Sequence, residues 1–294
     1  MKFAASYDTC FDDTYAAGDA RLTRLYRNGQ ALQWDAAARI DWNEDIDFEN
    51  PLGYDDRFIP IWGSPQWTQA SDTGRADLRR NYHAYSISQF LHGEQAAMLA
   101  AARLVEVLPD QHSKQLAAVQ ACDEARHVEV FHRLLKDKIG LFYPIDDGLQ
   151  SLIRHGLSEN RWDMVVFTAQ ILIEGLALAA LQQLRDFSKH KLIRDIGAYV
   201  LADEARHVAF GMQLLQTRYA EMSDAELRER RAFADTGLDA LTQRLNPAVV
   251  WGPREAPSNL PLLKSHLTRK VVDMTDKLFP RSSHVTKEVQ YAQI

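Results

Sequence analysis

The sequence predicts an all-α protein built around a four-helix bundle that arises from a duplicated helical hairpin. Apolar residues recur at helical spacing along most of the chain, and the apolar–polar alternation that marks a strand is never sustained. The segment Asp-Glu-Ala-Arg-His at 123–127 recurs at 203–207, an offset of 80 residues. Because each copy lies in one of two matched pairs of long helical segments, the repeat indicates two copies of one hairpin.

The composition is that of a globular protein whose partners are neither nucleic acids nor anionic membranes. Of 294 residues, 46% are hydrophobic and 25% charged, and the formal net charge is -6 without a dense basic block. The two cysteines, Cys10 and Cys122, are too few for a disulfide framework, and Cys122 is expected to be a small buried residue. No signal peptide is evident, so a cytoplasmic location is expected.

The N-terminal quarter is expected to combine a helix with an irregular aromatic segment. Residues 8–38 are predicted to be helical. Residues 40–74 are rich in Trp, Pro, Asp and Gly and carry six large aromatic side chains, so they are expected to wrap the bundle. Long irregular segments in compact domains are often functional, which makes this wrap a candidate lid.

Four long helices are expected to form the bundle, at 77–108, 113–138, 159–187 and 191–219, with a connection at 140–148. A fifth is expected at 223–245, because Ser223 and Glu226 form a capping-box signature and Asn246-Pro247 ends it. A short helix follows Pro261, and the last residues are expected to be a mobile tail. We therefore expect one domain over 1–294, with 76–220 as the metal-binding bundle, 1–75 as the N-terminal helix and wrap, and 221–294 as C-terminal helices and tail.

Six side chains in the repeats form a candidate site for a pair of metal ions. In each copy the Glu and the His lie three residues apart, on one face of a helix. Thirty residues upstream of each of these glutamates lies another one, in strongly apolar sequence, again at the offset of 80. A lone ionised Glu in such surroundings costs several kcal/mol unless a cation compensates it. The candidate ligands are Glu94, Glu124, His127, Glu174, Glu204 and His207.

The charge of this ligand set favours iron or manganese. Four carboxylates balance two divalent ions, so the occupied site is neutral and can lie inside a bundle. Carboxylate and imidazole ligands suit iron and manganese, whereas structural zinc more often takes thiolates. Two iron ions and a mixed manganese–iron pair accept the same ligands.

The residues beside the ligands are expected to support them. A metal-bound imidazole usually donates its other N–H to a carboxylate. We expect Asp123 to contact His207 and Asp203 to contact His127 across the bundle, which ties the two repeats together. Arg126 and Arg206 are expected to pair with neighbouring carboxylates.

One stretch, 164–181, reaches the length and apolarity of a membrane span. Its single charge, Glu174, lies near the middle, where an ionised group is costly in lipid. The place of Glu174 in the repeat indicates instead a helix in the core of the bundle.

At these residues the chain resembles the ferritin-like di-iron carboxylate superfamily. The Asp-Glu-x-Arg-His form of both motifs is similar to that of the hydroxylase subunits of bacterial multicomponent monooxygenases. It also resembles the small subunit of ribonucleotide reductase and its oxidase relatives. The resemblance covers about 77–219, and it implies a ferritin-like bundle, a pair of iron ions held by the six candidate ligands, and oxygen chemistry.

Three positions depart from relatives in this superfamily. Phe131 stands four residues after the first ligand histidine, where radical-forming small subunits carry a tyrosine. Leu178 stands four residues after Glu174, where monooxygenase hydroxylases commonly carry a threonine. Val200 stands one turn before Glu204, where arylamine N-oxygenases usually add a histidine.

The ligand set and the resemblance together predict an oxygen-dependent di-iron oxidase or monooxygenase that hydroxylates, N-oxygenates or desaturates a small organic substrate. The reaction is expected to pass through a bridged peroxo intermediate and to draw two electrons from a ferredoxin or a flavin reductase. The substrate is expected in an apolar pocket beside the ligand helices. The candidate lining of this pocket is Phe90, Ala97, Phe131, Phe167, Ile171, Leu178 and Phe210.

Two other functions stay open on the sequence. One is a ferroxidase or iron-storage protein, against which the length of the chain counts. The other is a radical-generating subunit of a nucleotide-reducing complex, against which Phe131 counts. A homodimer is an open alternative for the assembly.

Overall fold

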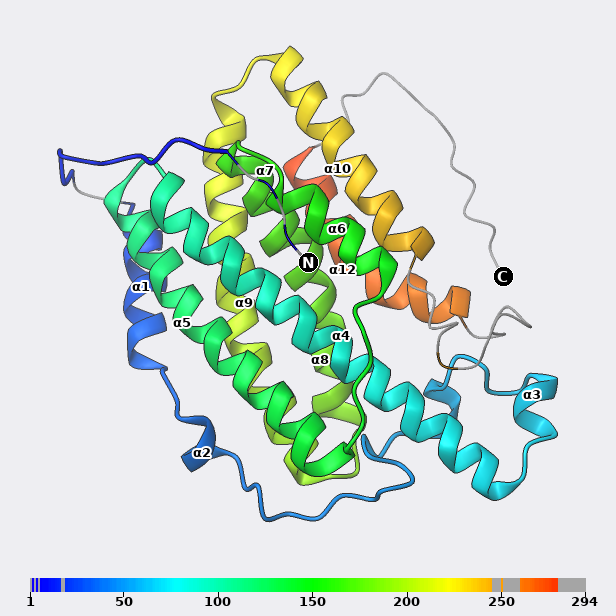
Figure 1. The fold of residues 1–294 in the computed structure, drawn as a ribbon. Coiled ribbons are helices and arrows are strands. Elements are labelled where there is room, and N and C mark those ends of the chain that lie inside the picture. Colours follow the sequence, from blue (N-terminus) through cyan, green and yellow to red (C-terminus); the bar gives the residue numbers. More distant parts are fainter. Residues whose placement is uncertain are drawn as a thin grey trace.

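The computed structural model describes residues 6–16, 19–244 and 260–279, together with residues 2, 4 and 250. Every regular element in this part of the chain is a helix, which confirms the all-α class (Figure 1). The long bundle helices are α4 (Asp72–Val107), α5 (Gln111–Arg133), α8 (Glu174–Phe187) and α9 (Lys191–Ala220). The other elements are α1 (Ala20–Ala31), α2 (Ala36–Arg39), the 3-10 turn η1 (Asp56–Phe58), α3 (Pro65–Thr68), the π-helix η2 (Leu134–Ile139), α6 (Asp147–Leu157), α7 (Trp162–Val166), the π-helix η3 (Phe167–Ile173), α10 (Asp224–Arg244) and α12 (Leu260–Leu278).

The two hairpins expected from the repeat are both present. α4 packs along α5, and α8, which continues from α7 and η3, packs along α9. In Figure 1 these helices form the centre of the molecule, and α5 also contacts α9. This last contact brings the two Asp-Glu-Ala-Arg-His segments together.

Side-chain caps and a proline set the limits of the first hairpin. Ser71 accepts a hydrogen bond from Gly74 N at 3.1 Å and starts α4 five residues before its predicted start. The helix ends before Pro109, which disfavours helical backbone at Leu108. Asp110 then accepts a hydrogen bond from Ser113 N at 2.9 Å and starts α5.

The second hairpin contains a feature that helical spacing does not predict. The helix expected over 159–187 is present as the continuous run of α7, η3 and α8, and its middle is π-helical. The N–H of Glu174 therefore donates to the carbonyl of Ala169, five residues back rather than four. The wider turn sets the direction in which Glu174 leaves the helix, and π-turns are frequent at functional sites.

Shorter helices cover two sides of the bundle. α1 lies on α5 and α9, whereas α6, α10 and α12 pack over η3 and α8 (Figure 1). α10 begins with the predicted capping box, in which Glu226 accepts a hydrogen bond from Ser223 N at 2.9 Å and Ser223 accepts one from Glu226 N at 3.4 Å. α6 is an additional helix, just after the predicted connection.

The N-terminal helix is shorter than the sequence predicts. Residues 6–16 are not helical, and α1 starts after Asp19, whose carboxylate accepts a hydrogen bond from Arg21 N. Asp12 accepts hydrogen bonds from both the backbone N–H and the hydroxyl of Thr14. Such local bonds compete with helix formation. The expectation of a helix over 8–38 is therefore wrong in its first part.

Residues 40–74 are mostly irregular, as predicted, and pack against the bundle. Leu52 and Tyr54 are buried on either side of Gly53, which has a φ of +63°. A Cβ at Gly53 would lie 2.8 Å from the ring of His190, so both the backbone conformation and the close approach require glycine. This tight passage anchors the middle of the wrap.

The run Trp162–Phe187 has the length and hydropathy of a membrane span, but 72% of its most apolar window is buried inside the protein. A core helix of a globular protein has this property, as the sequence analysis expects. The predicted helix end at Asn246-Pro247 and the predicted tail lie outside the described residues.

Candidate metal centre

The six candidate ligands converge in the middle of the bundle. They come from all four bundle helices, and the three-residue spacing within α5 and within α9 places each Glu and its His on one inward face. The exposed fractions of the six side chains lie between 0 and 5%. The set consists of Glu94 on α4, Glu124 and His127 on α5, Glu174 on α8, and Glu204 and His207 on α9.

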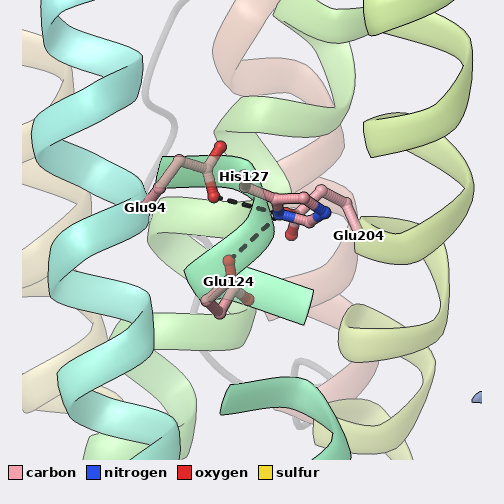
Figure 2. Close-up of side chains that lie close together, drawn as sticks. All are labelled: Glu94, Glu124, His127 and Glu204. Atoms are coloured by element: carbon pink, nitrogen blue, oxygen red, sulfur yellow. Dashed lines mark hydrogen bonds and ion pairs between the residues drawn. The ribbon is translucent and has the colours of Figure 1, made fainter. Parts of the chain in front are cut away.

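These side chains form two overlapping groups of four. Within each group, one ligand atom from every residue lies within 4.8 Å of the others. The first group is Glu94, Glu124, His127 and Glu204, and the second is Glu124, Glu174, Glu204 and His207. Figure 2 shows the first group, with Glu94 and Glu124 directed at the ring of His127. Glu124 and Glu204 belong to both groups, so they would be shared by two ions bound there.

Each imidazole turns Nδ1 toward the carboxylates. Nδ1 of His127 lies 3.3 Å from Glu94, 3.2 Å from Glu124 and 3.1 Å from Glu204. Nδ1 of His207 lies 3.0 Å from Glu124. Nδ1 is therefore the ring nitrogen available to a metal ion in both repeats.

The opposite ring nitrogens contact the aspartate of the other repeat, in the crossed arrangement expected from the sequence. His127 Nε2 lies 3.1 Å from Asp203, and His207 Nε2 lies 3.1 Å from Asp123. With its proton on Nε2, each imidazole donates to an aspartate and keeps a lone pair on Nδ1. The contact fixes the orientation of the ring.

The two arginines join both aspartates. Arg126 donates to Asp123 at 2.5 Å and to Asp203 at 3.0 Å, and Arg206 donates to Asp203 at 2.6 Å and to Asp123 at 3.2 Å. Burial works to raise the pKa of each aspartate, but the hydrogen bond from the facing imidazole and the nearby positive charges keep that pKa below its usual range. Both aspartates are therefore ionised acceptors for the imidazole protons.

Two residues that sequence reasoning missed complete this network. Trp34 Nε1 donates to Asp203 at 2.8 Å, and Gln33 Nε2 donates to Asp123 at 2.7 Å. The Trp34 ring also faces the guanidinium of Arg126, 4.8 Å from the ring centroid. Both residues follow α1, outside the duplicated hairpins, so the repeat does not mark them.

A pair of glutamines, also not predicted, supports Glu174. Gln170 Nε2 donates to Gln120 Oε1 at 2.6 Å, and Gln120 Nε2 donates to Glu174 Oε1 at 2.6 Å. All three side chains are buried. The sequence does contain a signal for these two glutamines. Gln120 lies one helical turn before Glu124, and Gln170 lies at the same spacing before Glu174.

Buried ligand atoms that make no hydrogen bond show that the residues present fit a metal pair. Glu174 Oε2, both carboxylate oxygens of Glu204 and Nδ1 of His207 are buried and make no hydrogen bond. Burial raises the pKa of Glu94 and Glu174 well above that of an ordinary carboxyl group, and the charge of Glu204 raises it further. Cations between these groups would remove the cost, and oxygen and nitrogen ligands of this kind suit iron and manganese.

A cavity of about 210 Å³ lies between α4 and α8 and reaches the cluster. Glu94, Glu174 and Glu204 form part of its wall. Among the predicted pocket residues, Phe90 and Ala97 line it. The wrap contributes Leu52, Tyr54, Phe58 and Pro60, so this segment does border the cavity, as the sequence analysis expects of a lid.

The other five predicted pocket residues do not line the cavity. Phe131 stacks behind Phe90, with ring centroids 5.1 Å apart. Leu178 lies off the wall, which α8 forms instead with Leu176, Ala177 and Ala180. The remaining three pack in the apolar core with residues of α6 and α10. Two of them belong to the π-helical η3, whose wider turn changes side-chain directions from the α-helical spacing on which the expectation relied, and the third lies on α9 and faces this core. These three are Phe167, Ile171 and Phe210.

A family model described as P-aminobenzoate N-oxygenase AurF matches residues 16–249. This range holds the bundle and all six candidate ligands. The chain belongs to the AurF family. No curated protein sequence matches it.

Solved structures agree with the fold of this AurF-family chain. An R2-like ligand-binding oxidase with an aerobically reconstituted Mn/Fe cofactor has a TM-score of 0.54 at 16% identity, over 88% of this chain and 93% of that chain. Two variants of R2-like ligand-binding oxidase with anaerobically reconstituted Mn/Fe cofactors have TM-scores of 0.62 and 0.58, also at 16% identity and over 90% of this chain. They are covered over 94% and 95% of their own lengths. The likeness shows a shared ferritin-like helical fold.

One position of this AurF-family chain limits its ligand set. Val200, one turn before Glu204, is fully buried in an apolar cluster with Ile193 and Ile196. A valine has no donor atom, so no seventh ligand comes from this position.

Proposed function

We propose that this AurF-family protein is an oxygen-dependent di-metal oxidase that oxidises a small organic substrate in the cavity beside Glu94 and Glu174. One observation carries the proposal: two overlapping ligand groups share Glu124 and Glu204 and border a largely apolar cavity. The description of the family favours N-oxygenation over hydroxylation and desaturation.

The ligand groups assign side chains to each ion. One ion would be held by Glu94 and His127, the other by Glu174 and His207, with Glu124 and Glu204 shared between them. Two iron ions, or one iron and one manganese ion, supply the redox electrons for dioxygen reduction when bound.

The surrounding side chains position the ligands. Ionised Asp123 and Asp203 accept the Nε2 protons, so the imidazoles keep Nδ1 toward the site. Gln120 holds one oxygen of Glu174 and leaves the other directed into the cluster. The apolar wall of the cavity limits water at the ligands and accommodates an apolar substrate.

The two alternative functions have less support. Radical-forming subunits carry a tyrosine at the position of Phe131, and a phenylalanine has no phenol group that could form the radical. The Phe131 ring is fully buried and packs against Phe90. An apolar cavity suits an organic molecule better than the passage of hydrated iron.

Four further expectations about the protein stay predictions. They are a single domain over 1–294, a cytoplasmic location, an external electron donor such as a ferredoxin or a flavin reductase, and the open alternative of a homodimer. The electron donor follows from the reaction, because N-oxygenation of an amine with release of water consumes two electrons beyond those of the substrate.

Metal stoichiometry tests the ligand assignment. Glu94→Ala and Glu174→Ala each remove a ligand that serves one ion, so each variant is expected to retain one ion per chain. Glu124→Ala removes a shared ligand and is expected to lose both. The measurement is elemental analysis after anaerobic loading with Fe²⁺ and desalting, with the exposed Glu129→Ala on α5 as the matched control. Two irons bound to Glu174→Ala with unchanged affinity would contradict the assignment.

Oxygen incorporation tests the reaction. Iron-loaded protein is supplied with a chemical reductant, ¹⁸O₂ and a panel of arylamines, and the products are analysed by mass spectrometry. Labelled oxygen in an organic product supports the proposal. A mineral iron core, or a persistent tyrosyl signal in the EPR spectrum, supports one of the alternatives instead.

A further inference from the structure

The charge of the cavity wall restricts the substrate. Among the described residues, the wall includes four carboxylates and no lysine, arginine or histidine. Three of the carboxylates, Glu94, Glu174 and Glu204, belong to the metal-binding cluster. The fourth, Asp146, immediately precedes α6 and belongs to neither ligand group, so the wall carries a carboxylate outside the ligand set as well.

Asp146 is held in place without a basic partner. Its Oδ1 accepts hydrogen bonds from Gly148 N at 2.8 Å and from Leu149 N at 3.4 Å, which caps α6. Its Oδ2 accepts the hydroxyl of Tyr85 at 2.9 Å. The described residues offer it no ion pair with a lysine or arginine. The carboxylate can therefore accept a further hydrogen bond from a molecule in the cavity.

Apart from Asp146, the lining outside the metal-binding cluster is aromatic or uncharged. Tyr54, Phe58, Tyr82 and Tyr85 contribute aromatic rings to it, and Ser86 is polar but neutral. Aromatic faces attract cations and pack against aromatic ligands. The wall thus combines an acceptor carboxylate with ring faces, which is a suitable environment for an ammonium or another hydrogen-bond donor.

This wall is unsuited to a substrate such as p-aminobenzoate. A molecule that presents its amine to the metal-binding cluster directs its carboxylate toward the other end of the cavity. There it would meet Asp146 and no described basic side chain, and a buried carboxylate without a counter-charge is strongly disfavoured. The four ligand carboxylates would already balance the charge of two divalent ions. The occupied cluster would therefore have no net positive charge to attract the carboxylate of p-aminobenzoate.

We propose that the substrate is an aromatic amine without a negative charge, whose end remote from the metal-binding cluster bears an ammonium or other hydrogen-bond donor that Asp146 accepts. The proposal rests on the proposed function, because it assumes that the cavity holds the substrate. It separates this chain from the p-aminobenzoate chemistry in the description of its family.

A matched series of ligands tests the inference without turnover. Protein loaded with Mn²⁺ in the absence of oxygen is titrated calorimetrically at pH 7 with p-aminobenzoate, p-aminobenzamide and p-aminobenzylamine, which carry an anion, a neutral amide and a cation at the same position. p-Aminobenzylamine is expected to bind at least ~10-fold more tightly than p-aminobenzoate, with the amide between them. Equal or tighter binding of p-aminobenzoate, or no binding of p-aminobenzylamine, overturns the inference.

Two variants assign the effect to Asp146. Asp146→Asn keeps a helix-capping side chain and removes the charge, so it is expected to reduce the preference for p-aminobenzylamine over the amide to about one third or less of its original value. Asp147→Asn changes a neighbouring exposed carboxylate outside the cavity wall and is expected to leave the preference unchanged. Equal behaviour of the two variants overturns the role of Asp146, and circular dichroism verifies that both are folded.

Failure of this inference and failure of the proposed function give different results. If p-aminobenzylamine binds more tightly but iron-loaded protein incorporates no labelled oxygen into any arylamine, the function is wrong and the charge preference stands. If labelled oxygen enters p-aminobenzoate and this anion is the tighter ligand, the function stands and the charge preference is wrong.

Discussion

Gln120 illustrates how one residue supports the site without being a candidate ligand. It is fully enclosed, and its amide links Gln170 to one oxygen of Glu174. Loss of such a donor leaves a buried carboxylate oxygen without its hydrogen bond and loosens the carboxylate that faces one ion.

We therefore expect Gln120→Leu to weaken one of the two metal sites. The affinity for one ion is expected to fall by at least ~10-fold while two ions still bind at saturation, because no ligand is removed. Calorimetric titration of the metal-free protein with Mn²⁺ under nitrogen measures both quantities. Gln216→Leu, on the exposed face of α9, is the control. Unchanged affinity at both sites would show that Gln120 does not position Glu174.

His83, which is not part of the metal-binding cluster, makes a pH-dependent contribution to stability. It is fully buried, its Nδ1 accepts a hydrogen bond from Leu52 N at 3.3 Å, and burial lowers its pKa to about 3. An unfolded histidine has a pKa of about 6.5, so below that pH the unfolded chain binds a proton that the folded chain does not. Stability is therefore lost as the pH falls from about 6.5 toward 3.

At pH 5 this loss amounts to ~2 kcal/mol relative to pH 7. In His83→Asn, which has an acceptor but no titrating group, the difference in unfolding free energy between pH 7 and pH 5 is expected to shrink by that amount. Urea unfolding at the two pH values measures it. Equal differences in the variant and the parent protein would contradict the assignment to His83.

The burial of Cys122 could not be predicted from that of the next residue in the sequence. Its place beside the first motif predicts a small buried side chain, but Cys122 is exposed. Each step along an α-helix turns the side chain by about 100°, so Asp123 and Glu124 face the bundle while Cys122 faces outward. That expectation was wrong.

At the scale of elements, a close contact between two helices depends on a glycine. A Cβ at Gly197 in α9 would lie 2.8 Å from the backbone nitrogen of Arg185 and 2.9 Å from Cβ of Leu184, both in α8. Backbone cannot move aside as a flexible side chain can. Gly197 thus sets how closely the two helices of the second hairpin approach.

Gly197→Ala is expected to reduce the unfolding free energy by ~1–3 kcal/mol, since it forces α8 and α9 apart. Gly93→Ala in α4 is the matched control, because its Cβ would meet only Ile173 Cγ2 at 3.9 Å. The control is expected to be as stable as the parent or more stable by up to ~1 kcal/mol, as helical propensity predicts. Denaturant unfolding compares the two, and equal stability would contradict the tight contact.

The limits of the elements were predictable where side-chain caps and prolines set them, as at Pro109 and at the Ser223–Glu226 capping box. The two π-helical stretches were not. Their sequences are compatible with an ordinary α-helix, so the hydrogen bonds to the fifth residue back are not marked by helical spacing. The candidate ligands could be named from spacing, whereas most of the pocket wall depends on helix rotation and on contacts with the wrap.

At the scale of the molecule, the metal-binding cluster makes stability dependent on metal. The buried carboxylates of Glu174 and Glu204 have oxygens without a hydrogen bond, and ions that bind only the folded chain stabilise it. At 100 times its dissociation constant, each bound ion is expected to add ~2.7 kcal/mol to the unfolding free energy.

Denaturant unfolding with and without Mn²⁺, under nitrogen, measures this increment. The parent protein is expected to gain ~5 kcal/mol from two ions, and Glu94→Ala about half of that gain from one. An increment in Glu94→Ala as large as in the parent protein would show that Glu94 does not contribute to either ion.

The sequence by itself determined the helical class, the duplicated hairpin and the six side chains that meet at its centre. These follow from local periodicity and from a repeat whose offset is the same for every member, and both are properties of the chain alone. Only the tertiary structure decided that Glu124 and Glu204 belong to both ligand groups. It also decided which residues face the cavity and that the cluster is supported by Gln33, Trp34 and Gln120. Those relations depend on helix rotation, on π-turns and on contacts between segments far apart in the chain, which helical spacing alone does not fix.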